Sequence, residues 1–292
     1  MVRTVRPALF LCALAVPGWL WASLSDITAA DTSAARTEPW KRKLTGTLTL
    51  AQTGFTNWAK GGQNSITWNT RLTGDASRTV KKWSYVFSAL FVFGQTKQEG
   101  ESVRNTADKI DLDAAVACKI SKYINPEIGV GILTQFSKGY DYKKDPPVQK
   151  SNFFDPGYIT QSIGGMVKIG SRFNSRLGIG LKQTLTKKFT AHTDNPETEK
   201  VEKIKFESGI DSKTDLINAE LTSNLVVRSK LYLFSAFEHI DVIDMDWDTL
   251  FTAKLNSHIV VTLNILLKYD KDLIDKLQFQ ETTSVGLSYS FI

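Results

Sequence analysis

Four aspartates near the end of the chain are the residues whose type and spacing bear most directly on chemistry. Asp241, Asp244, Asp246 and Asp248 flank Trp247 in a segment that we predict to be an outer loop. If the loop were extended, the last three carboxylates would point the same way, and clustered carboxylates can hold Ca²⁺. No glycine turn or complete calcium-loop spacing accompanies them. We therefore expect a solvated acidic loop without a bound metal.

The histidines could supply acid–base chemistry, but they lack a suitable arrangement. His239 and Asp241 are predicted near the top of a strand, yet their order and surroundings fit no hydrolase pattern. His192 and His258 fall in a loop and a turn. We expect no catalytic residue, no cofactor and no enzymatic activity. A surface hydrolase that uses His239 stays open as the least favoured alternative.

Charged residues also stand at alternate positions within apolar stretches. Asp111 and Asp113, for example, alternate with Ile110, Leu112 and Ala114. In an extended strand such charged residues share one face, where opposite signs can pair and an unpaired basic excess would favour anions. The charged residues singled out on this face, which we expect to line a lumen, are Arg71, Asp111, Asp113, Lys119, Lys182 and Lys268.

These side chains must be positioned by β-strands, because alternation with a period of two recurs from about residue 43 to the end of the chain. In the last segment, Phe279, Val285 and Leu287 share an apolar face, whereas Gln278 and Gln280 share a polar face. The alternating segments run about 10 to 14 residues, which is longer than strands of soluble sheets and matches a tilted membrane span. We therefore predict lipid outside the sheet and a wet lumen inside it, with a β-sandwich as the alternative.

The connections between these segments predict the number of strands. They alternate between short and long, and in outer-membrane barrels the short turns face the periplasm. A chain that starts and ends in the periplasm needs an even number of strands. We predict an all-β fold, a transmembrane antiparallel up-and-down β-barrel of about 12 strands, with 14 as the alternative. The predicted strands are residues 43–53, 64–76, 83–95, 107–121, 127–138, 158–170, 176–188, 203–227, 230–240, 246–256, 258–270 and 278–291. The short connections are 78–82, 123–126, 173–175, 227–230 and 256–258, and the long ones are 54–64, 96–107, 139–157, 189–202, 240–246 and 270–277.

The beginning of the chain predicts secretion. Arg3 and Arg6 precede an apolar run from 8 to 24, and small residues follow, which is the pattern of a signal peptide. An N-terminal membrane anchor is the alternative. We expect residues 1–30 to be the signal peptide, 31–42 a periplasmic lead-in and 43–292 a barrel in the outer membrane of a Gram-negative-type cell envelope.

Composition excludes several classes of function. The formal net charge of +6 is spread along the chain, whereas nucleic-acid binding needs clustered charge. Cys118 is the one cysteine after the predicted leader, so we expect no intramolecular disulfide and interpret it as a small packed hydrophobe. No later segment has about 18 consecutive apolar residues, which excludes helical membrane spans. The expected partners are outer-membrane lipid, the machinery that inserts outer-membrane barrels and a small solute.

One predicted loop concentrates residues suited to contact with a partner. Its two glycines permit tight turning or a close approach of the backbone, and its tryptophan can stack or anchor. We favour a hairpin that folds over the mouth of the barrel and fixes its first two strands; ligand contact is the alternative. The loop residues singled out are Asn57, Trp58, Gly61, Gly62 and Asn64.

The segment around this loop carries a resemblance. Residues 52–65 read Q-T-G-F-T-N-W-A-K-G-G-Q-N-S. This resembles the motif Q-T-x-F-x-N-W-x-x-G-G-x-N-S of an uncharacterised family of bacterial outer-membrane β-barrel proteins, a domain-of-unknown-function family. Residues 154–158, 233–235 and 278–291 look similar to other parts of that family. The resemblance implies a barrel and assigns no activity.

Taken together, these features favour an outer-membrane barrel that acts as a small channel or solute conduit. The alternating strands and the charged inner face support a channel, and no catalytic arrangement competes with it. A sealed structural or binding barrel that presents long loops outside is the main alternative.

Overall fold

The computed structural model describes residues 37–55, 63–121, 123–169, 172–194, 198–271 and 274–292. The predicted signal peptide lies outside the described residues, and so do Asn57, Trp58, Gly61 and Gly62 of the predicted mouth loop. Within the described part of the chain, no helix is long and apolar enough to cross a membrane.

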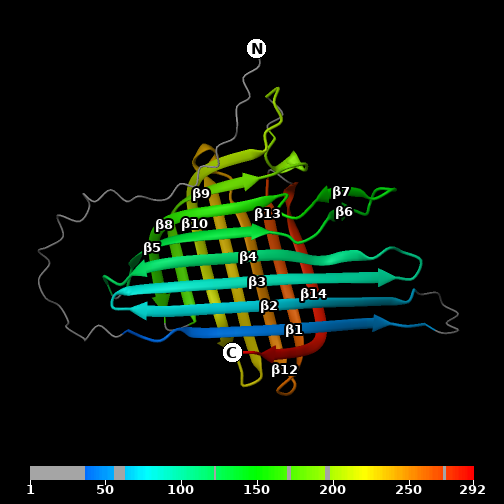
Figure 1. Ribbon diagram of the computed structural model, residues 1–292, viewed down its shortest axis with the longest axis horizontal. Coiled ribbons are helices and arrows are strands. Elements are labelled where there is room, and N and C mark those ends of the chain that lie inside the picture. Colours follow the sequence, from blue (N-terminus) through cyan, green and yellow to red (C-terminus); the bar gives the residue numbers. More distant parts are fainter. Residues whose placement is uncertain (1–36, 56–62, 122, 170–171, 195–197, 272–273) are drawn as a thin grey trace, which may run out of the picture. The chain divides into compact units, whose positions relative to one another are not determined.

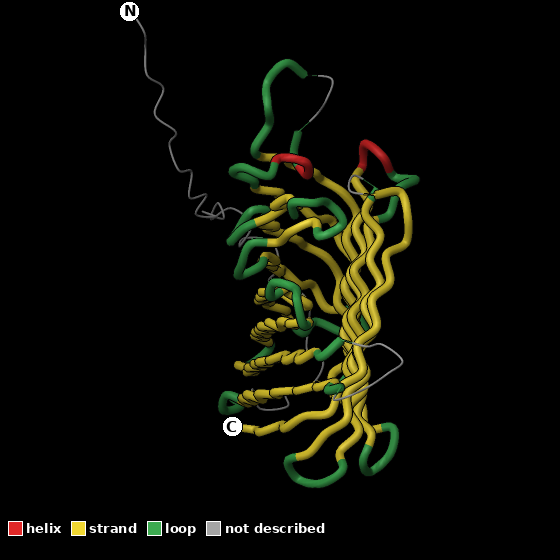
Figure 2. Tube along the Cα trace, turned by 90° about the vertical axis from the view of Figure 1, so that its right-hand side faces the viewer, coloured by secondary structure: helices red, strands yellow, loops and turns green. Residues whose placement is uncertain are grey.

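Twelve antiparallel strands close into a barrel, in the order β1-β14-β13-β12-β11-β10-β9-β8-β5-β4-β3-β2. Figure 1 shows β1 to β5 as a front wall that crosses over the strands of the back wall, and Figure 2 shows the same barrel from the side. The prediction of an all-β barrel of 12 strands is confirmed. The barrel strands are β1 Lys41–Thr53, β2 Ser65–Val80, β3 Trp83–Gln98, β4 Arg104–Cys118, β5 Asn125–Thr134, β8 Gly157–Ile169, β9 Phe173–Leu185, β10 Ile204–Glu220, β11 Leu225–Ala236, β12 Asp244–Lys254, β13 Ile259–Asp270 and β14 Ile274–Ser290.

The long connection between β5 and β8 contains two further strands. These are β6 Gly139–Asp141 and β7 Val148–Ser151, which form a separate two-stranded sheet. Two short 3-10 helices lie in other connections, η2 Thr190–His192 and η3 Phe237–His239. Because β6 and β7 form their own sheet, the 14 strands of the described residues include only 12 barrel strands.

The outer face of the barrel is apolar and exposed. Strand register aligns Val116, Ile128, Ile163, Ile179 and Ile210 in one row across five neighbouring strands. The four isoleucines are 58%, 59%, 58% and 40% exposed. Soluble monomers rarely expose a contiguous apolar surface of this extent. The row therefore needs a covering that is not water.

The other parity faces inward and is polar. On β14, Gln278, Gln280 and Thr282 line the interior cavity, whereas Phe279 and Val285 are 61% and 52% exposed. A strand presents alternate residues to its two faces, so the polar set of the predicted pattern lies inside. The barrel is thus inverted relative to a soluble domain, with charges in its interior and hydrocarbon on its surface.

Several predicted connections differ from the structure. The connection between β10 and β11 spans 221–224, not 227–230, because Leu221 N and Leu225 N bond to Leu225 O and Thr222 O in a tight turn. The predicted long loops at 96–107 and 270–277 shrink to 99–103 and 271–273, because the flanking strands continue their ladders beyond the apolar segments. The contrast between the two ends of the barrel therefore depends mainly on the connections 54–64, 135–156 and 186–203.

Strand β4 also ends earlier than predicted, at Cys118 instead of residue 121. Asn125 Oδ1 accepts hydrogen bonds from Ile120 N at 2.9 Å and Ser121 N at 3.1 Å, which turns the chain away from the sheet. Lys119 consequently lies exposed beyond the strand. Its backbone N–H donates a hydrogen bond to Lys82 O in the turn between β2 and β3. The side chain of Lys119 is therefore not part of the cavity wall described below.

Candidate functional site

The interior of the barrel contains a cavity of about 750 Å³. All twelve barrel strands contribute to its wall, and Lys150 and Ser151 of β7 reach it as well. Acidic and basic side chains from opposite walls meet within it. This charged interior is the candidate functional site.

Strand β12 supplies the carboxylates that the sequence suggested for a calcium loop. Asp244, Asp246 and Asp248 lie on the strand itself and line the cavity, so the expectation of a solvated acidic loop is wrong for these three residues. Trp247, between Asp246 and Asp248, is 40% exposed on the outer face, as the strand period requires. Among the described residues, no group of three or more His, Cys, Asp or Glu side chains is placed to hold a metal ion. The aspartates are instead neutralised by basic side chains.

Lys109 joins two opposite walls. It lies on β4, which is separated from β12 by five strands in either direction around the barrel. Its Nζ is 3.5 Å from Asp246 Oδ1 and 4.0 Å from Asp248 Oδ2 on β12, and 3.7 Å from Asp111 Oδ2 on its own strand. Ion pairs between opposite strands require the two walls to lie within two side-chain lengths of each other.

Lys230 makes a second connection across the lumen. From β11 its Nζ donates to Asp111 at 2.7 and 2.8 Å and to Asp113 at 2.6 Å, both on β4. Lys213 on β10 also pairs with Asp113. Two carboxylates lie around one ammonium with a second ammonium beside them, so opposite charges balance at this point of the cavity.

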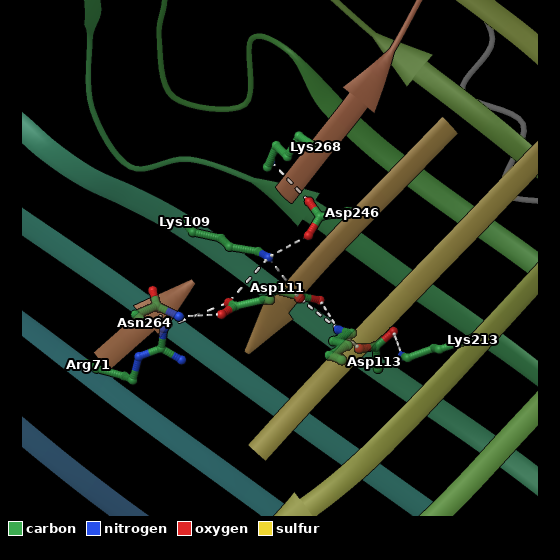
Figure 3. Close-up of polar contacts among 10 residues, drawn as sticks. Arg71, Lys109, Asp111, Asp113, Lys213, Asp246, Asn264 and Lys268 are labelled. Carbon is green, nitrogen blue, oxygen red and sulfur yellow. Dashed lines mark hydrogen bonds and ion pairs between the residues drawn. The ribbon is translucent and has the colours of Figure 1, made fainter. Parts of the chain in front are cut away.

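The network continues toward β2 and β13. Arg71 Nη2 is 3.7 Å from Asp248 Oδ2 and donates to Asn264 Oδ1 at 3.3 Å. Asn264 Nδ2 in turn donates to Asp248 Oδ1 at 2.6 Å, and Lys268 Nζ is 3.0 Å from Asp246 Oδ2. We call the ten connected residues the lumen network; eight of them are labelled in Figure 3. They are Arg71, Lys109, Asp111, Asp113, Lys213, Lys230, Asp246, Asp248, Asn264 and Lys268.

Further ion pairs lie above and below the lumen network. Arg228 on β11 makes a bidentate pair with Asp75 on β2, at 2.9 and 3.0 Å. Toward the other end, Lys182 Nζ is 2.6 Å from Asp244 Oδ2. Because β2 and β11 are not neighbours, the Arg228–Asp75 pair also bridges the lumen.

Arg176 forms the most enclosed of these pairs. It donates to Asp211 Oδ2 at 2.7 Å and to Glu127 Oε1 at 3.2 Å, and Asp211 is 1% exposed. Gly129 on β5 makes room for the guanidinium, because a Cβ at this position would lie 2.3 Å from Arg176 Nη1. The glycine on β5 thus leaves space for the long arginine side chain from β9.

The structure brings most of the sequence-predicted lumen residues together. Arg71, Asp111, Asp113, Lys182 and Lys268 line the cavity, and each has a partner of opposite charge. Sequence reasoning missed their partners Lys109, Lys213 and Lys230. Lys109 precedes Asp111 by two residues, so extending the same alternation would have found it. Lys230 was assigned to a turn, which hid its parity.

The mouth of the barrel is held by polar contacts. Asn64, the described member of the predicted mouth loop, accepts a hydrogen bond from Phe55 N at 2.6 Å and donates to Glu99 Oε2 at 2.7 Å. The connection 135–156 is fixed at its start by Asp108, which accepts from Phe136 N and Ser137 N at 2.6 and 2.9 Å. Asn64 therefore joins two connections, 54–64 and 99–103.

The second end of that connection is equally well held. Asp155, 2% exposed, accepts from Lys187 N and Lys188 N at 2.9 Å each. Between the two anchors, Lys150 and Ser151 reach the cavity. The connection 135–156 thus narrows the mouth from above while the lumen network narrows the middle.

Among the described residues, the interior presents paired charged side chains and uncharged polar side chains to the cavity. Two polar atoms on the cavity wall, Tyr232 Oη and Asn174 Oδ1, have no protein partner within the described part of the chain. Both atoms are buried, and buried polar groups are normally hydrogen-bonded.

Comparison with known proteins gives one family match. A family model described as "Protein of unknown function (DUF3078)" matches residues 50–140, which is less than half of the chain. The matched region contains the 52–65 segment and strands β2 to β5, and so includes Arg71, Lys109, Asp111 and Asp113. No curated protein matched the sequence.

Three solved structures are similar in outline. An outer-membrane channel from Pseudomonas putida F1 is 10% identical and has a TM-score of 0.37, with 90% of this chain and 99% of that chain covered. The translocator domain of autotransporter NalP from Neisseria meningitidis is 8% identical, with a TM-score of 0.34 and coverages of 85% and 86%. The β-domain of the Bordetella autotransporter BrkA is 8% identical, with a TM-score of 0.26 and coverages of 87% and 98%. These likenesses are to outer-membrane barrels, but TM-scores this low carry no argument about function.

The enclosed Arg176–Asp211 pair leads to a prediction about stability. Replacing Asp211 with alanine leaves a buried guanidinium with only Glu127, and we expect the free energy of unfolding to fall by ~3 kcal/mol. The matched control is Glu220→Ala, which breaks the Arg172–Glu220 pair at 3.1 Å between side chains that are 50% and 61% exposed. That change should cost no more than ~1 kcal/mol. Urea titration followed by tryptophan fluorescence measures both, and equal losses would contradict the assigned role of the lumen pairs.

Proposed function

We propose that the protein is a transmembrane barrel of a Gram-negative-type outer membrane that passes small polar solutes through a narrow lumen. One observation carries the proposal: the barrel has exposed hydrocarbon on its outer face and paired charges inside. Transmembrane barrels have this inverted polarity because their outer face contacts lipid and their lumen contacts water. Outside the short β1–β14 seam, the strand ladders also pair the backbone groups that a membrane would leave without water.

The height of the apolar surface supports a membrane location. On β3 the outward residues run from Trp83 to Phe93, a rise of ~33 Å along the strand at ~3.3 Å per residue. With the usual strand tilt of about 40° this becomes ~25 Å, which is the height of the apolar band in outer-membrane barrels. Exposed aromatic side chains lie toward both ends, such as Trp83 and Tyr289 at one end and Phe206 at the other. Aromatic residues favour the interface between lipid and water.

The strand count supports an orientation. The first and last strands both have their chain ends on the side of the short connections. In outer-membrane barrels these connections face the periplasm and the long loops face outside. We infer that connections 135–156 and 186–203 are extracellular.

The lumen favours small solutes over large ones. The bridges made by Lys109, Lys230 and Arg228 divide the cross-section, so a solute must pass beside them. Charges of both signs face the cavity, which gives no strong preference for one ion sign while the pairs are intact.

A sealed barrel is the second candidate, and the bridges across the lumen favour it specifically. In that case the barrel would be a structural support that presents its extracellular loops to a partner. Neither candidate assigns a catalytic step. His239 and Asp241, which suggested a hydrolase, are both exposed within the connection 237–243.

Conductance in planar bilayers tests the proposal. We expect the unmodified protein to give small single-channel currents. Lys230→Ala should raise the conductance several-fold and shift selectivity toward cations, because Asp111 and Asp113 lose a counter-charge and the bridge is removed. Lys254→Ala is the matched control, since Lys254 is exposed at the short-connection end and does not line the cavity. No current from the unmodified protein, together with no solute flux into liposomes, would reject the conduit in favour of the sealed barrel.

Insertion into lipid is tested separately. Ile163→Lys puts a charge in the middle of the outer isoleucine row and should cost ~2–4 kcal/mol of folding free energy in bilayers. Thr160→Lys, on the same strand but facing the cavity, should cost much less. Folding into phosphatidylcholine liposomes at graded urea concentrations measures the difference. Equal costs would argue against lipid around the barrel.

Assembly by the outer-membrane insertion machinery is a further part of the proposal. Tyr289 and Phe291 are 57% and 58% exposed at the end of β14, and their rings lie 5.0 Å apart. Such a terminal aromatic pair is available to a receptor for unfolded barrels. We expect Phe291→Ala to lower the amount of folded protein in cell envelopes, while folding of the purified protein into liposomes stays unchanged. An unchanged envelope level would remove Phe291 from the insertion signal.

A further inference from the structure

The seam that closes the barrel is short. Strands β1 and β14 pair over only five positions, from Thr45↔Ser290 to Thr49↔Gly286. On its other side β1 pairs with β2 over thirteen positions, from Lys41 to Thr53. Among the described residues, the β1–β14 ladder is the shortest in the barrel. The upper part of this seam, toward the long connections, is unpaired.

Residues on both sides of the opening could have continued the ladder. Extending the register would place Leu50 opposite Val285 and Ala51 opposite Ser284, but these positions are not paired. Unpaired backbone groups cost several kcal/mol each in hydrocarbon and are tolerated where they line a water-filled space. A pocket of about 280 Å³ occupies this place, and it shares Thr49, Thr282 and other lining residues with the main cavity.

The lower edge of the opening is set by Gly286, the last residue of β14 that pairs with β1. A Cβ there would lie 2.2 Å from Leu48 O and 2.7 Å from Thr49 Cα. The absence of a side chain lets the strands approach closely at this one position. The seam is therefore tight up to Thr49 and separates immediately above it. We call the opening between residues 50–53 and 278–285 the lateral slit.

The lateral slit interrupts the apolar outer surface with polar residues. Gln52, Thr283 and Glu281 are exposed on its two rims. Their neighbours on the adjoining strands are apolar: Gln52 pairs with Ile66 on β2, and Glu281 with Ile265 on β13. The polar rims and the missing strand pairs coincide at one height, so a polar path connects the lumen to the lipid-facing surface.

The inner lining of the slit carries uncharged hydrogen-bonding groups. Hydroxyls and amides predominate, and no charged side chain of the described residues lines the smaller pocket. Outside it, Leu50 and Val285 are 56% and 52% exposed and offer apolar contact. The lining groups used in this argument are Thr49, Thr67, Asn69, Gln280, Thr282 and Ser284.

We infer that the lateral slit is a binding site for a single-chain amphiphile of the surrounding membrane, with an uncharged, hydroxyl-bearing head group. The head group lies among the threonines and amides of the pocket, and the alkyl chain lies along Leu50 and Val285. A volume of 280 Å³ holds about nine waters at ~30 Å³ each, or a head group of that size. Glu281 at the rim disfavours a carboxylate head. This inference rests on the proposed membrane location, but not on axial conduction.

A disulfide lock tests the site. In a protein without the native cysteines Cys12 and Cys118, the pair Ala51→Cys and Ser284→Cys closes the slit on oxidation. The pair Thr47→Cys and Ser288→Cys is the matched control, because Thr47↔Ser288 is already paired in the closed part of the seam. The two pairs are four residues apart along the same strands, so both face inward, and Ala51 and Ser284 would take the pairing geometry of Thr47 and Ser288 if the ladder extended to them.

The probe is a monoacylglycerol with a photoreactive diazirine near its head group, added to liposomes that contain the protein. We expect labelling of residues around Thr282 and Thr67, several-fold weaker in the oxidised 51–284 lock, restored by reduction and unaffected by the 47–288 lock. A fatty acid of the same chain length should label several-fold less. Thr282→Trp, which fills the pocket, should also abolish labelling and covers the case in which the lock disturbs folding.

Other outcomes would overturn the inference. These are equal labelling of locked and unlocked protein, labelling confined to outward residues such as Val285, and equal labelling by the fatty acid. Photocrosslinking of a second copy of the chain in place of the probe would assign the slit to a protein contact. Conductance recorded from the same preparations separates the two proposals, because loss of axial current rejects the conduit and leaves the labelling result standing.

Discussion

Neutralisation of charge across the lumen is the constraint on which the rest of this structure depends. The outer face carries hydrocarbon, so the basic and acidic residues of twelve strands must share the interior. Charges removed from bulk water are tolerated only with partners of opposite sign. Lys109 and Lys230 pair with aspartates on opposite walls. The distance between these walls therefore cannot exceed the combined length of a lysine and an aspartate side chain. Where a long side chain meets a wall at close range, as Arg176 does, the wall provides a glycine.

The same ion pairs have opposite effects on the closure of the barrel and on the passage of a solute. Ion pairs that bridge the lumen hold the walls together, yet they occupy the space through which a solute would move. A pair can exchange partners at little cost where several carboxylates surround one cation, and Lys230 has two within 2.8 Å. The lumen network therefore differs from a packed apolar core, in which any displacement leaves a void. The lateral slit lies where the lining of the interior is uncharged, so an opening there breaks no ion pair of the lumen network.

Strand alternation was sufficient to predict the barrel and the inward parity of Asp111, Asp113, Lys182 and Lys268, and the strand number also required the alternation of short and long connections. It failed where polar residues enter a strand near its end. Asp244 to Asp248 looked like a loop because three carboxylates in five residues are unusual in a soluble strand, although Met245 and Trp247 keep the strict period. The turn at 221–224 was misplaced because Arg228 and Lys230 resemble turn residues, yet they point into the lumen. Pairing partners could not be predicted at all, because the contact between β4 and β12 exists only after the sheet has closed.

The position of the slit follows from the connectivity of the chain. Neighbours such as β2 and β3 are joined by a two-residue connection, and the hairpin sets their register. Strands β1 and β14 lie at opposite ends of the barrel sequence, so no turn fixes how far their ladder extends. Closing a loop that spans the whole barrel also costs more conformational entropy than closing a hairpin. The length of the β1–β14 ladder therefore depends on the side chains. Below, Gly286 lets the two strands approach closely. Above, Gln52 and Glu281 are polar, so extending the ladder there would place polar side chains against lipid. Because no turn fixes this seam, strands β1 and β14 can separate here without changing the register of any hairpin.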